Sequence, residues 1–372
     1  MAKLGDIATY INGYAFKPQD WSDEGIPIIR IQDLTGNSYQ ANRYNGEYAS
    51  KYEVNDGDVL ISWSASLGVY VWHGEKAVLN QHIFKVVFDK ERISKDFFVH
   101  QVGLILENAA SDAHGATMKH LTKPVFDALP FYLPPYEKQC EIAEVLDKVT
   151  SLISLRNQQL AKLDELVKAQ FVEMFGDPVN NPMNYPKSHL GKVCDVRDGT
   201  HDSPEYYDVG YPLVTSKNVT GGKIDLSECN LISEDDYKKI CERSKVDRGD
   251  IIMPMIGTVG KPVIVNIEPM FAIKNVALIK FTPNSLVTNI YIKTLLESDY
   301  FDRAVLDKIR GGTQKFIALG DIRKLEIILP DLKHQLCFSV FVERVDQQKQ
   351  TVQQSLEKLE LMKKALMQEY FG

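Results

Sequence analysis

The chain has 372 residues, of which 44% are hydrophobic and 25% are charged, and its net charge is −7. This length suits two domains of ordinary size, and the balance is that of a folded globular protein, which excludes a disordered or collagen-like chain. The first residues contain no apolar run of signal-peptide length, and no stretch approaches the roughly 20 apolar residues that cross a bilayer. We therefore expect a cytoplasmic protein that makes no membrane contact.

The charge distribution limits how the chain could bind nucleic acid. Lys and Arg number 12 against 16 acidic residues in 1–134, 5 against 8 in 135–180, 20 against 20 in 181–330 and 6 against 6 in 331–372. Because neutralised phosphates supply most non-specific affinity for DNA, we expect weak DNA binding without basic partners. The five cysteines form no C-x-x-C pair and the eight histidines are scattered, so we expect neither disulfides nor a metal site.

The predicted elements form the same series twice along the chain. Short β-branched and aromatic runs bounded by Gly, Pro, Asn and Asp predict strands, and apolar residues at three- and four-residue spacing predict helices. In the first half the predicted strands are 26–31, 57–63 and 82–88, followed by a helix at 97–108 and a long helix after Pro134-Pro135. After a linker-like stretch at 177–188, the second half repeats strands at 212–216, 249–255 and 276–281, a helix at 289–309 and a long helix after Pro330.

An internal repeat supports this series. Residues 115–176 match residues 311–372 without a gap, so that Gln139 corresponds to Gln335 and Phe175-Gly176 corresponds to Phe371-Gly372. The upstream segments match more loosely: 3–16 with 189–202, 25–37 with 210–222, 55–68 with 247–260, and 79–88 with 273–281. The helical segments that end the two halves match closely, whereas the domains before them match only loosely. This difference indicates a common scaffold with different ligands.

The two long helices carry an apolar stripe with a period near 3.5, the seam of a coiled coil. The stripe consists of Ile142, Leu146, Val149, Ile153, Leu160, Leu163, Val167 and Met174 in the first helix, and of Phe338, Val342, Val345, Val352, Leu356, Leu359, Leu366 and Tyr370 in the second. Arg156, Lys349 and Lys363 interrupt it. We expect an antiparallel coiled coil with a pseudo-two-fold relation between the halves. The alternative is that each helix packs only on its own globular domain.

The chain shows no recognisable catalytic motif. The strings Asp177-Pro178-Val179-Asn180 and Asn181-Pro182-Met183-Asn184 lack the second proline and the aromatic ring of an amino-methyltransferase motif. The stretch 257–262 lacks the first glycine and the final Ser or Thr of a phosphate-binding loop, and its counterpart at 64–68 is a similar turn after a strand. No Ser-His-Asp or Cys-His arrangement and no nuclease cluster can be assembled. We expect a binding protein without a catalytic site.

The repeat and its strings resemble the specificity subunits of type I restriction–modification enzymes. The resemblance extends over the whole chain and includes GDVLIS at 57–62, LNQH at 79–82 and LPFYLPPYEKQ at 129–139. It implies an α+β protein with target-recognition domains at 1–134 and 177–330 and conserved helical regions at 135–176 and 331–372. Lys138 departs from the family, whose members often have an acidic residue there, and the second copy, LKHQLCFSVF, departs further.

The resemblance also implies a function and partners. Each recognition domain would read one half of a split, asymmetric DNA site, and the helices would set the gap between the halves. The helices would also dock a pair of methyltransferase subunits, which bind S-adenosylmethionine and methylate adenine, so this chain itself would need no cofactor. Motor–nuclease (restriction and translocase) subunits would join when restriction is performed.

Candidate DNA-binding residues are polar side chains at strand ends and turns, where a rigid scaffold can present them to base edges. In the first domain they are Arg30, Gln32, Ser62, Ser64, Asn80, Gln81 and Lys119. In the second domain they are Thr215, Lys217, Asn218, Thr258, Lys274, Asn275, Gln314 and Lys315. Lys119 and Lys315 occupy the same repeat position, so we assign them to phosphates, whereas Trp63 and Trp72 are expected in the core.

Two other classes of function stay open at this point. The chain could be a coiled-coil scaffold whose globular ends bind protein. It could also be a self-contained methyltransferase or nuclease. Methylation with a partner, or activity of the isolated chain with S-adenosylmethionine or a divalent metal, would distinguish these possibilities.

Overall fold

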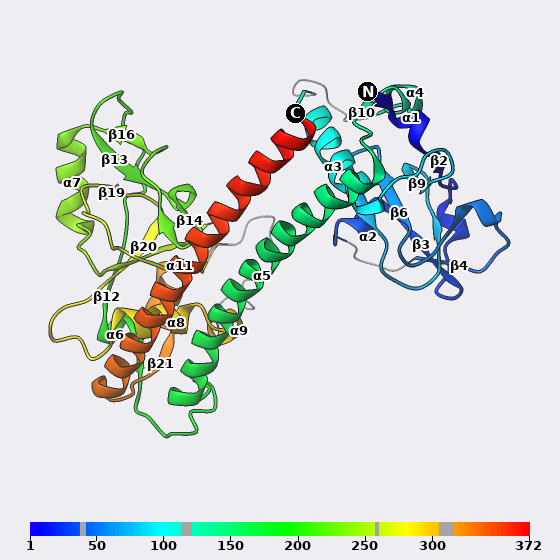
Figure 1. Ribbon diagram of the computed structural model, residues 1–372. Coiled ribbons are helices and arrows are strands. Elements are labelled where there is room, and N and C mark those ends of the chain that lie inside the picture. The colour runs from blue at the N-terminus through cyan, green and yellow to red at the C-terminus, as the bar shows by residue number, and fades with distance from the viewer. Residues whose placement is uncertain (38–41, 113–120, 257–259, 305–315) are drawn as a thin grey trace. The chain divides into compact units, whose positions relative to one another are not determined.

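The computed structural model describes residues 1–37, 42–112, 121–256, 260–304 and 316–372 (Figure 1). The chain forms two compact units, unit 1 with residues 1–157 and 354–372, and unit 2 with residues 158–353. Each unit therefore contains one α+β domain and one half of each long helix. We call residues 1–134 domain 1 and residues 177–330 domain 2.

Domain 1 is built from short strands with one long helix. Its helices are α1 (Leu4–Ile7), η1 (Pro18–Asp20), α2 (Ile31–Leu34), η2 (Ser50–Tyr52), α3 (Lys95–Asp112) and α4 (Lys123–Asp127). Its strands are β1 (Ala2–Lys3), β2 (Thr9–Asn12), β3 (Ile26–Ile29), β4 (Arg43–Tyr44), β5 (Glu53–Val54), β6 (Val59–Ser62), β7 (Gly68–Val71), β8 (Ala77–Leu79), β9 (Ile83–Val87) and β10 (Pro130–Phe131).

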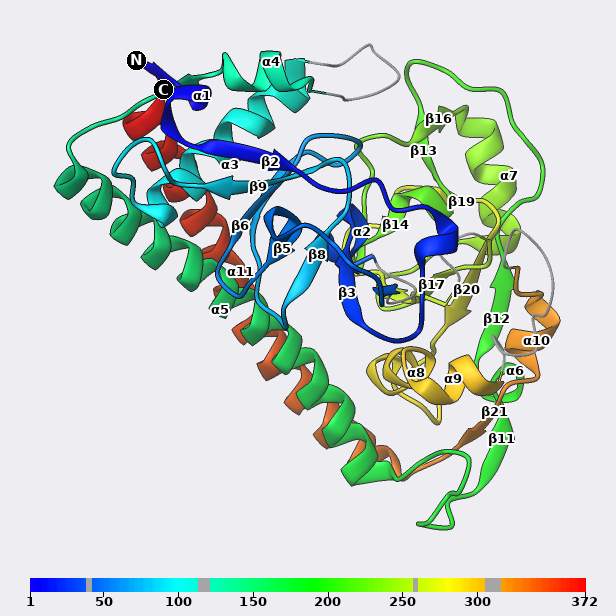
Figure 2. The ribbon, with the colours of Figure 1, turned by 90° about the vertical axis from the view of Figure 1, so that its right-hand side faces the viewer.

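Two four-stranded sheets organise domain 1. One has the order β2-β9-β6-β7 and is antiparallel, and the other has the order β4-β3-β8-β5, in which β3 and β8 run parallel. Figure 2 shows β2, β9 and β6 side by side. Phe97 and Phe98 of α3 are fully buried in one cluster with Ile61 and Phe84 of the first sheet, so this helix closes the main core of the domain.

Domain 2 repeats this plan with extra elements. Its helices are α6 (Leu190–Val193), η3 (Ser216–Asn218), α7 (Glu234–Ser244), α8 (Asn289–Leu296), α9 (Asp299–Ala304) and α10 (Leu319–Arg323). Its strands are β11 (Lys187–His189), β12 (Asp195–Asp198), β13 (Tyr211–Val214), β14 (Val219–Thr220), β15 (Lys223–Ile224), β16 (Asn230–Ile232), β17 (Ile251–Pro254), β18 (Val263–Ile264), β19 (Ala272–Ile273), β20 (Val276–Lys280) and β21 (Glu326–Ile328).

The main antiparallel sheet of domain 2 matches that of domain 1 in order and direction, and the second sheets share a parallel pair. The order β12-β20-β17-β18 corresponds to β2-β9-β6-β7, and the parallel pair β13 and β19 corresponds to β3 and β8. The short pair β11 and β21 corresponds to β1 and β10. All six predicted strands are therefore confirmed, and so is the duplicated α+β fold.

The prediction of one continuous helix over 289–309 is wrong. Helix α8 ends at Leu296, and the Ser298 hydroxyl donates to the Leu295 carbonyl at 2.6 Å before α9 begins at Asp299. A side chain that hydrogen-bonds its own backbone competes with the helical ladder, which explains the break. Residues 305–309 lie outside the described ranges.

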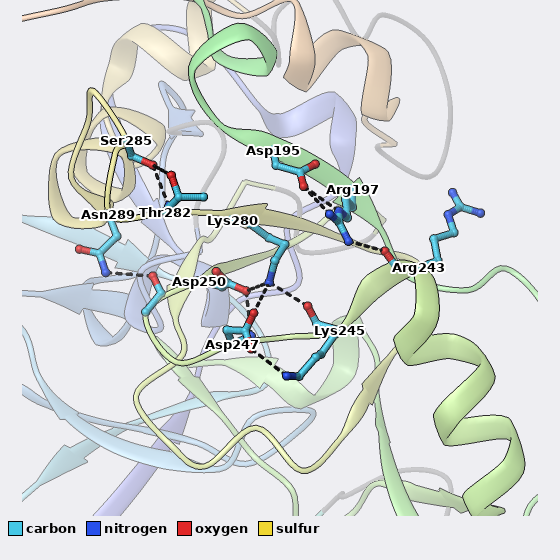
Figure 3. Close-up of polar contacts among 11 residues, drawn as sticks. Asp195, Arg197, Arg243, Lys245, Asp247, Asp250, Lys280, Thr282, Ser285 and Asn289 are labelled. Carbon is cyan, nitrogen blue, oxygen red and sulfur yellow. Dashed lines mark hydrogen bonds and ion pairs between the residues drawn. The ribbon is translucent and has the colours of Figure 1, made fainter.

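A repeated aspartate explains the Gly-Asp string before β6 and β17. In domain 2, Asp250 is 2% exposed, accepts a hydrogen bond from the Asp247 amide at 2.8 Å, and pairs with Lys280 at 2.7 Å (Figure 3). In domain 1 the equivalent Asp58 pairs with Lys85 at 2.8 Å. Both aspartates tie a turn to a neighbouring strand, so this string is structural.

The long helices are α5 (Tyr136–Phe175) and α11 (Leu332–Phe371), 40 residues each. In unit 1, Arg156 Nε donates to Ser355 Oγ at 3.2 Å, and Ile142 near the start of α5 belongs to a cluster on which Met367 near the end of α11 packs. The helices therefore run antiparallel within this unit. Every predicted seam residue is buried or half-buried, and Arg156 is accommodated by its polar contact.

In unit 2 the helices are also antiparallel. Lys349 Nζ pairs with Asp164 at 2.6 Å, and further along α5 the ring centroid of Phe171 lies 5.6 Å from that of Phe338 at the start of α11. Lys349 thus interrupts the seam with an ion pair between the helices. The last interrupting residue, Lys363, is half-buried in the part of α11 that belongs to unit 1.

The end of α11 packs on domain 1 rather than on domain 2, which precedes it in the chain. The ring of Phe371 lies 5.4 Å from that of Phe97 in α3. The equivalent Phe175, at the end of α5, lies 5.1 Å from Tyr291 in α8 of domain 2. The alternative that each helix packs only on its own domain is therefore wrong. The boundary between the two compact units passes through both long helices. The division into two recognition domains and two helical regions, with boundaries after residues 134, 176 and 330, therefore stays a prediction.

None of the described helices combines the length and apolarity needed to cross a membrane.

Candidate DNA-reading edge

Both domains contain one junction of two backbone segments, which we call the paired turn. In domain 1, the Tyr14 amide donates to the Leu79 carbonyl at 2.8 Å and the Gln81 amide donates to the Tyr14 carbonyl at 2.8 Å. In domain 2, the Thr200 amide donates to the Ile273 carbonyl at 3.0 Å, and the Asn275 amide donates to the Thr200 carbonyl at 3.2 Å. The predicted residues Asn80 and Gln81 thus occupy the positions of Lys274 and Asn275.

A glycine makes each paired turn possible. A Cβ atom on Gly13 would lie 2.0 Å from the Asn80 carbonyl oxygen, and one on Gly199 would lie 2.4 Å from the Ile273 carbonyl oxygen. Because these contacts are with backbone atoms, no side-chain adjustment could relieve them. The two glycines therefore let the segments approach closely and fix the backbone positions of Asn80 and Lys274.

A second turn of each domain follows the neighbouring parallel strand. In domain 1 it holds Arg30 and Gln32, and the Asp33 carboxylate accepts from the Arg30 amide at 2.8 Å. In domain 2 it holds Thr215 and Lys217, and the Asn218 side chain accepts from the Thr215 amide at 3.0 Å.

The two turns lie at one edge of each domain. Strands β3 and β8 are parallel neighbours, as are β13 and β19, and the carboxyl ends of parallel strands meet at the same edge of a sheet. The structure therefore brings together eight of the predicted residues in two equivalent sets. The sets are Arg30, Gln32, Asn80 and Gln81 in domain 1, and Thr215, Lys217, Lys274 and Asn275 in domain 2.

The other predicted residues do not join these sets. Ser62 is fully buried and its hydroxyl donates to the Ser66 carbonyl, so it has no surface to offer a base. Asn218 is 9% exposed and serves as the turn-capping residue. Ser64 is half-buried in the bend after β6. Lys119, Thr258, Gln314 and Lys315 lie outside the described residues.

The two tryptophans pack as predicted. Trp63 is half-buried, stacks on Phe84 with centroids 5.5 Å apart, and donates from Nε1 to Asn12 Oδ1 at 3.2 Å. Trp72 is half-buried against the core of the second sheet in domain 1. Both side chains therefore contribute mainly to the stability of domain 1.

Residues that the sequence reasoning did not select also lie at the paired turns. Tyr14 is 46% exposed and packs on Phe16, with ring centroids 4.9 Å apart, so it offers an aromatic face beside Asn80. In domain 2, Ser203 Oγ accepts from Lys274 Nζ at 2.6 Å. Tyr14 corresponds to Thr200 in the repeat alignment. The exposure of the Tyr14 side chain depends on packing that the sequence does not show.

His201 connects the paired turn of domain 2 to a buried carboxylate. Its Nδ1 lies 2.8 Å from Asn275 Oδ1, and its Nε2 lies 2.9 Å from Asp198 Oδ2. The hydrogen bond to Asn275 and then the one to Asp198 raise the pKa of His201. Asp198 is 7% exposed and also pairs with Arg243 of α7.

A cavity of about 330 Å³ lies between this turn and α7. The turn contributes Thr200, His201, Asp202, Ser203 and Pro204, and the helix contributes Asp236, Lys239, Ile240, Arg243 and Ser244. No counterpart of α7 occurs among the described elements of domain 1, so the two domains share a framework but differ in shape and charge beside it.

The comparisons with known proteins agree with this architecture. The family model for the type I restriction modification DNA specificity domain matches residues 1–165 and 182–361. The EcoBI specificity subunit of Escherichia coli is 23% identical over 92% of this chain and 78% of its own length. The MjaVIII specificity subunit of Methanocaldococcus jannaschii is 24% identical over 99% of this chain and 90% of its own length.

Solved structures share the fold at low sequence identity. The crystal structure of the type I restriction–modification S subunit from M. genitalium aligns over 100% of this chain and 95% of that one, with a TM-score of 0.55 and 13% identity. A chain from a study of complex assembly and conformational transition of the type I restriction–modification system aligns over 100% and 96%, with a TM-score of 0.57 and 16% identity. The matched family model spans both halves, so this chain belongs to the family of type I restriction–modification DNA specificity proteins.

Proposed function

We propose that this chain is a non-catalytic specificity subunit in which domain 1 and domain 2 each read one half of a split, asymmetric DNA site. The observation that supports this best is the duplicated reading edge, with one backbone framework and two different sets of side chains. Gln32 and Gln81 in domain 1 are replaced by Lys217 and Asn275 in domain 2. Since base edges differ in their donors and acceptors, unlike side chains on a common frame imply unlike half-sites.

The helices α5 and α11 would set the distance between the half-sites. A continuous 40-residue helix rises about 60 Å at 1.5 Å per residue, which is enough to separate two readers by a turn or more of DNA. The polar contacts of Arg156 and Lys349 support a fixed register between the helices, because a slip would leave both cations without these partners.

The helices would also dock partner subunits. In unit 1, α5 exposes Val145, Leu152 and Leu155 at spacings of seven and three, which places them on one face, and α11 exposes Leu361 and Met362. Exposed apolar side chains on a rigid helix are typical of protein interfaces. We infer that a pair of methyltransferase subunits binds here, that these hold S-adenosylmethionine and methylate adenine, and that restriction and translocase subunits join for cleavage.

The net charge of −7 supports a dependence on these partners, because phosphate contacts need cations that this chain does not have in excess. We place the assembly in the cytoplasm, with double-stranded DNA as its substrate. The scaffold and self-contained enzyme alternatives have no specific observation in their favour.

Mapping of methylated adenines tests the proposal. The genome of a cell that carries the gene should contain one split motif, with two half-sites and a constant gap, that loses methylation in a deletion strain. A deletion strain with an unchanged methylation pattern, although the partner methyltransferase is still produced, would refute the proposed function.

A further inference from the structure

We propose that His201 is a positioning residue that determines which end of the Asn275 amide domain 2 offers to a base, and that the choice follows the charge of the imidazole. The inference rests on the proposed function, because it concerns the half-site that domain 2 reads. It adds the class of base atom that is read and a dependence on pH.

The geometry requires a charged imidazole. The Asp198 carboxylate and the Asn275 Oδ1 atom are both acceptors, and they lie 2.9 Å and 2.8 Å from the two ring nitrogens of His201. With the Asn275 amide in this orientation both nitrogens donate, which only the doubly protonated ring can do. His201 occupies one lone pair of Asn275 Oδ1, whereas Nδ2 forms no hydrogen bond with the described residues, so the Nδ2 donor is the group more open to a ligand.

Each charge state of His201 selects a different readout. The charged ring holds Oδ1 and leaves the Nδ2 donor, which is complementary to base acceptors such as guanine O6 and N7 or thymine O4. A neutral ring keeps one N–H for the Asp198 carboxylate, so its Nδ1 becomes an acceptor. The Asn275 amide then turns by about 180° to donate to Nδ1 and offers its oxygen, which is complementary to adenine N6 or cytosine N4.

Charged groups from three segments surround the His201 ring. Asp198 and Asp202 come from its own segment, and Lys274 comes from the facing turn. Helix α7 contributes Asp236, Lys239 and Arg243 to the same cavity. The hydrogen bonds to Asn275 and Asp198 raise the pKa of His201 although Arg243 opposes the proton.

The proposed histidine–asparagine contact exists in domain 2 and has no equivalent at the same positions of domain 1. Ala15 stands in domain 1 where His201 stands in domain 2, and Asn12, the counterpart of Asp198, accepts a hydrogen bond from Trp63 at 3.2 Å. Enrichment of the half-site read by domain 1 at each pH therefore controls for folding and binding, while the change from base acceptor to base donor is looked for in the other half-site.

The test uses the full chain bound to its methyltransferase subunits and DNA in which both half-sites are randomised. Bound DNA is selected and sequenced at about pH 6 and about pH 8.5, on either side of the titration range of histidine. We expect the preference at one position of a single half-site to change from a base acceptor to a base donor by about threefold to tenfold, the effect of one hydrogen bond. His201→Lys, whose ammonium can only donate, should keep the low-pH preference at both pH values.

His73→Gln is the matched control, because His73 is also exposed and lies 3.5 Å from an aspartate, Asp56, but belongs to domain 1. This variant should keep the change with pH. An identical preference of the wild-type complex at both pH values would overturn the inference and leave the proposed function standing. If no sequence is enriched at either pH, the proposed function fails and the inference fails with it.

Discussion

Gln139 and Gln335 make equivalent hydrogen bonds at the starts of the two long helices. Gln139 accepts from the Ser94 amide at 2.9 Å and donates to the Pro134 carbonyl at 2.9 Å. Gln335 accepts from the Thr288 amide at 2.9 Å and donates to the Pro330 carbonyl at 2.8 Å. Both glutamines are fully buried, so each joins a long helix to the segment before the domain helix α3 or α8.

Removal of either glutamine should destabilise its unit. Gln139→Ala leaves one backbone donor and one backbone acceptor without their partner, and Gln335→Ala also frees the Leu286 carbonyl. Each unsatisfied buried group costs about 1–3 kcal/mol. We expect a loss of about 2–4 kcal/mol in the free energy of unfolding, measured with denaturant. Gln350→Ala, on the exposed face of α11, is the control and should change little. Equal effects of all three variants would contradict the structural role.

Lys280 should stabilise domain 2 more than Lys85 stabilises domain 1. The Asp250 side chain beside Lys280 is 3% exposed, whereas the Asp58 side chain beside Lys85 is 27% exposed. Lys280→Met would leave a buried carboxylate without its cation, which costs about 3–5 kcal/mol. Lys85→Met should cost less, because water reaches Asp58. Denaturant unfolding of both variants checks this ranking. A larger loss of stability for Lys85→Met than for Lys280→Met would show that burial of the aspartate does not determine the size of the effect.

Much of the fold could be predicted because it depends on local patterns. The strands follow β-branched runs, the long helices follow a seam of period 3.5, and the constant offset of the repeat exposes the duplicated plan. The break at Ser298 could not be predicted, since it depends on a side chain bonding its own backbone instead of continuing the helix.

The reading edge was only partly predictable. The prediction from strand ends included Gln81, Lys217 and Asn275, which lie at this edge, but also Ser62, which is buried, and no local pattern distinguishes a buried serine from an exposed one. The contact between His201 and Asn275 joins residues 74 positions apart, so only the folded chain reveals it.

Substitutions at the reading edge should act on one half-site at a time. Gln81→Ala should weaken discrimination in the half-site of domain 1, and Lys217→Ala in that of domain 2, each by about tenfold, as expected for the loss of one base contact. The double variant should combine both effects additively, because the two residues belong to different domains. The discrimination is measured by competition binding, in which DNA altered in one half-site competes for the chain bound to its methyltransferase subunits. Both substitutions affecting the same half-site would contradict the assignment.

The exposed apolar face of α5 should bind the methyltransferase subunits. Leu152→Ser with Leu155→Ser should weaken this association by at least about tenfold, since buried apolar area contributes to binding in proportion to its size. The free energy of unfolding should fall by only about 1 kcal/mol, because both side chains are about half exposed and serine lowers helix propensity only slightly. Val209→Ser, at a residue 86% exposed in a loop of domain 2, is the control. Unchanged association of the double variant, measured by calorimetry, would place the docking surface elsewhere.

Matched insertions in the two long helices test the central claim most directly. Leu160 of α5 and Val352 of α11 belong to one apolar cluster of unit 2, so four residues added after each lengthen both helices together. The added turn contributes about 6 Å, equivalent to one or two base pairs at about 3.4 Å each. We predict that the methylated motif keeps both half-sites and that the gap between them lengthens by one or two base pairs. Altered half-sites with an unchanged gap would contradict the account.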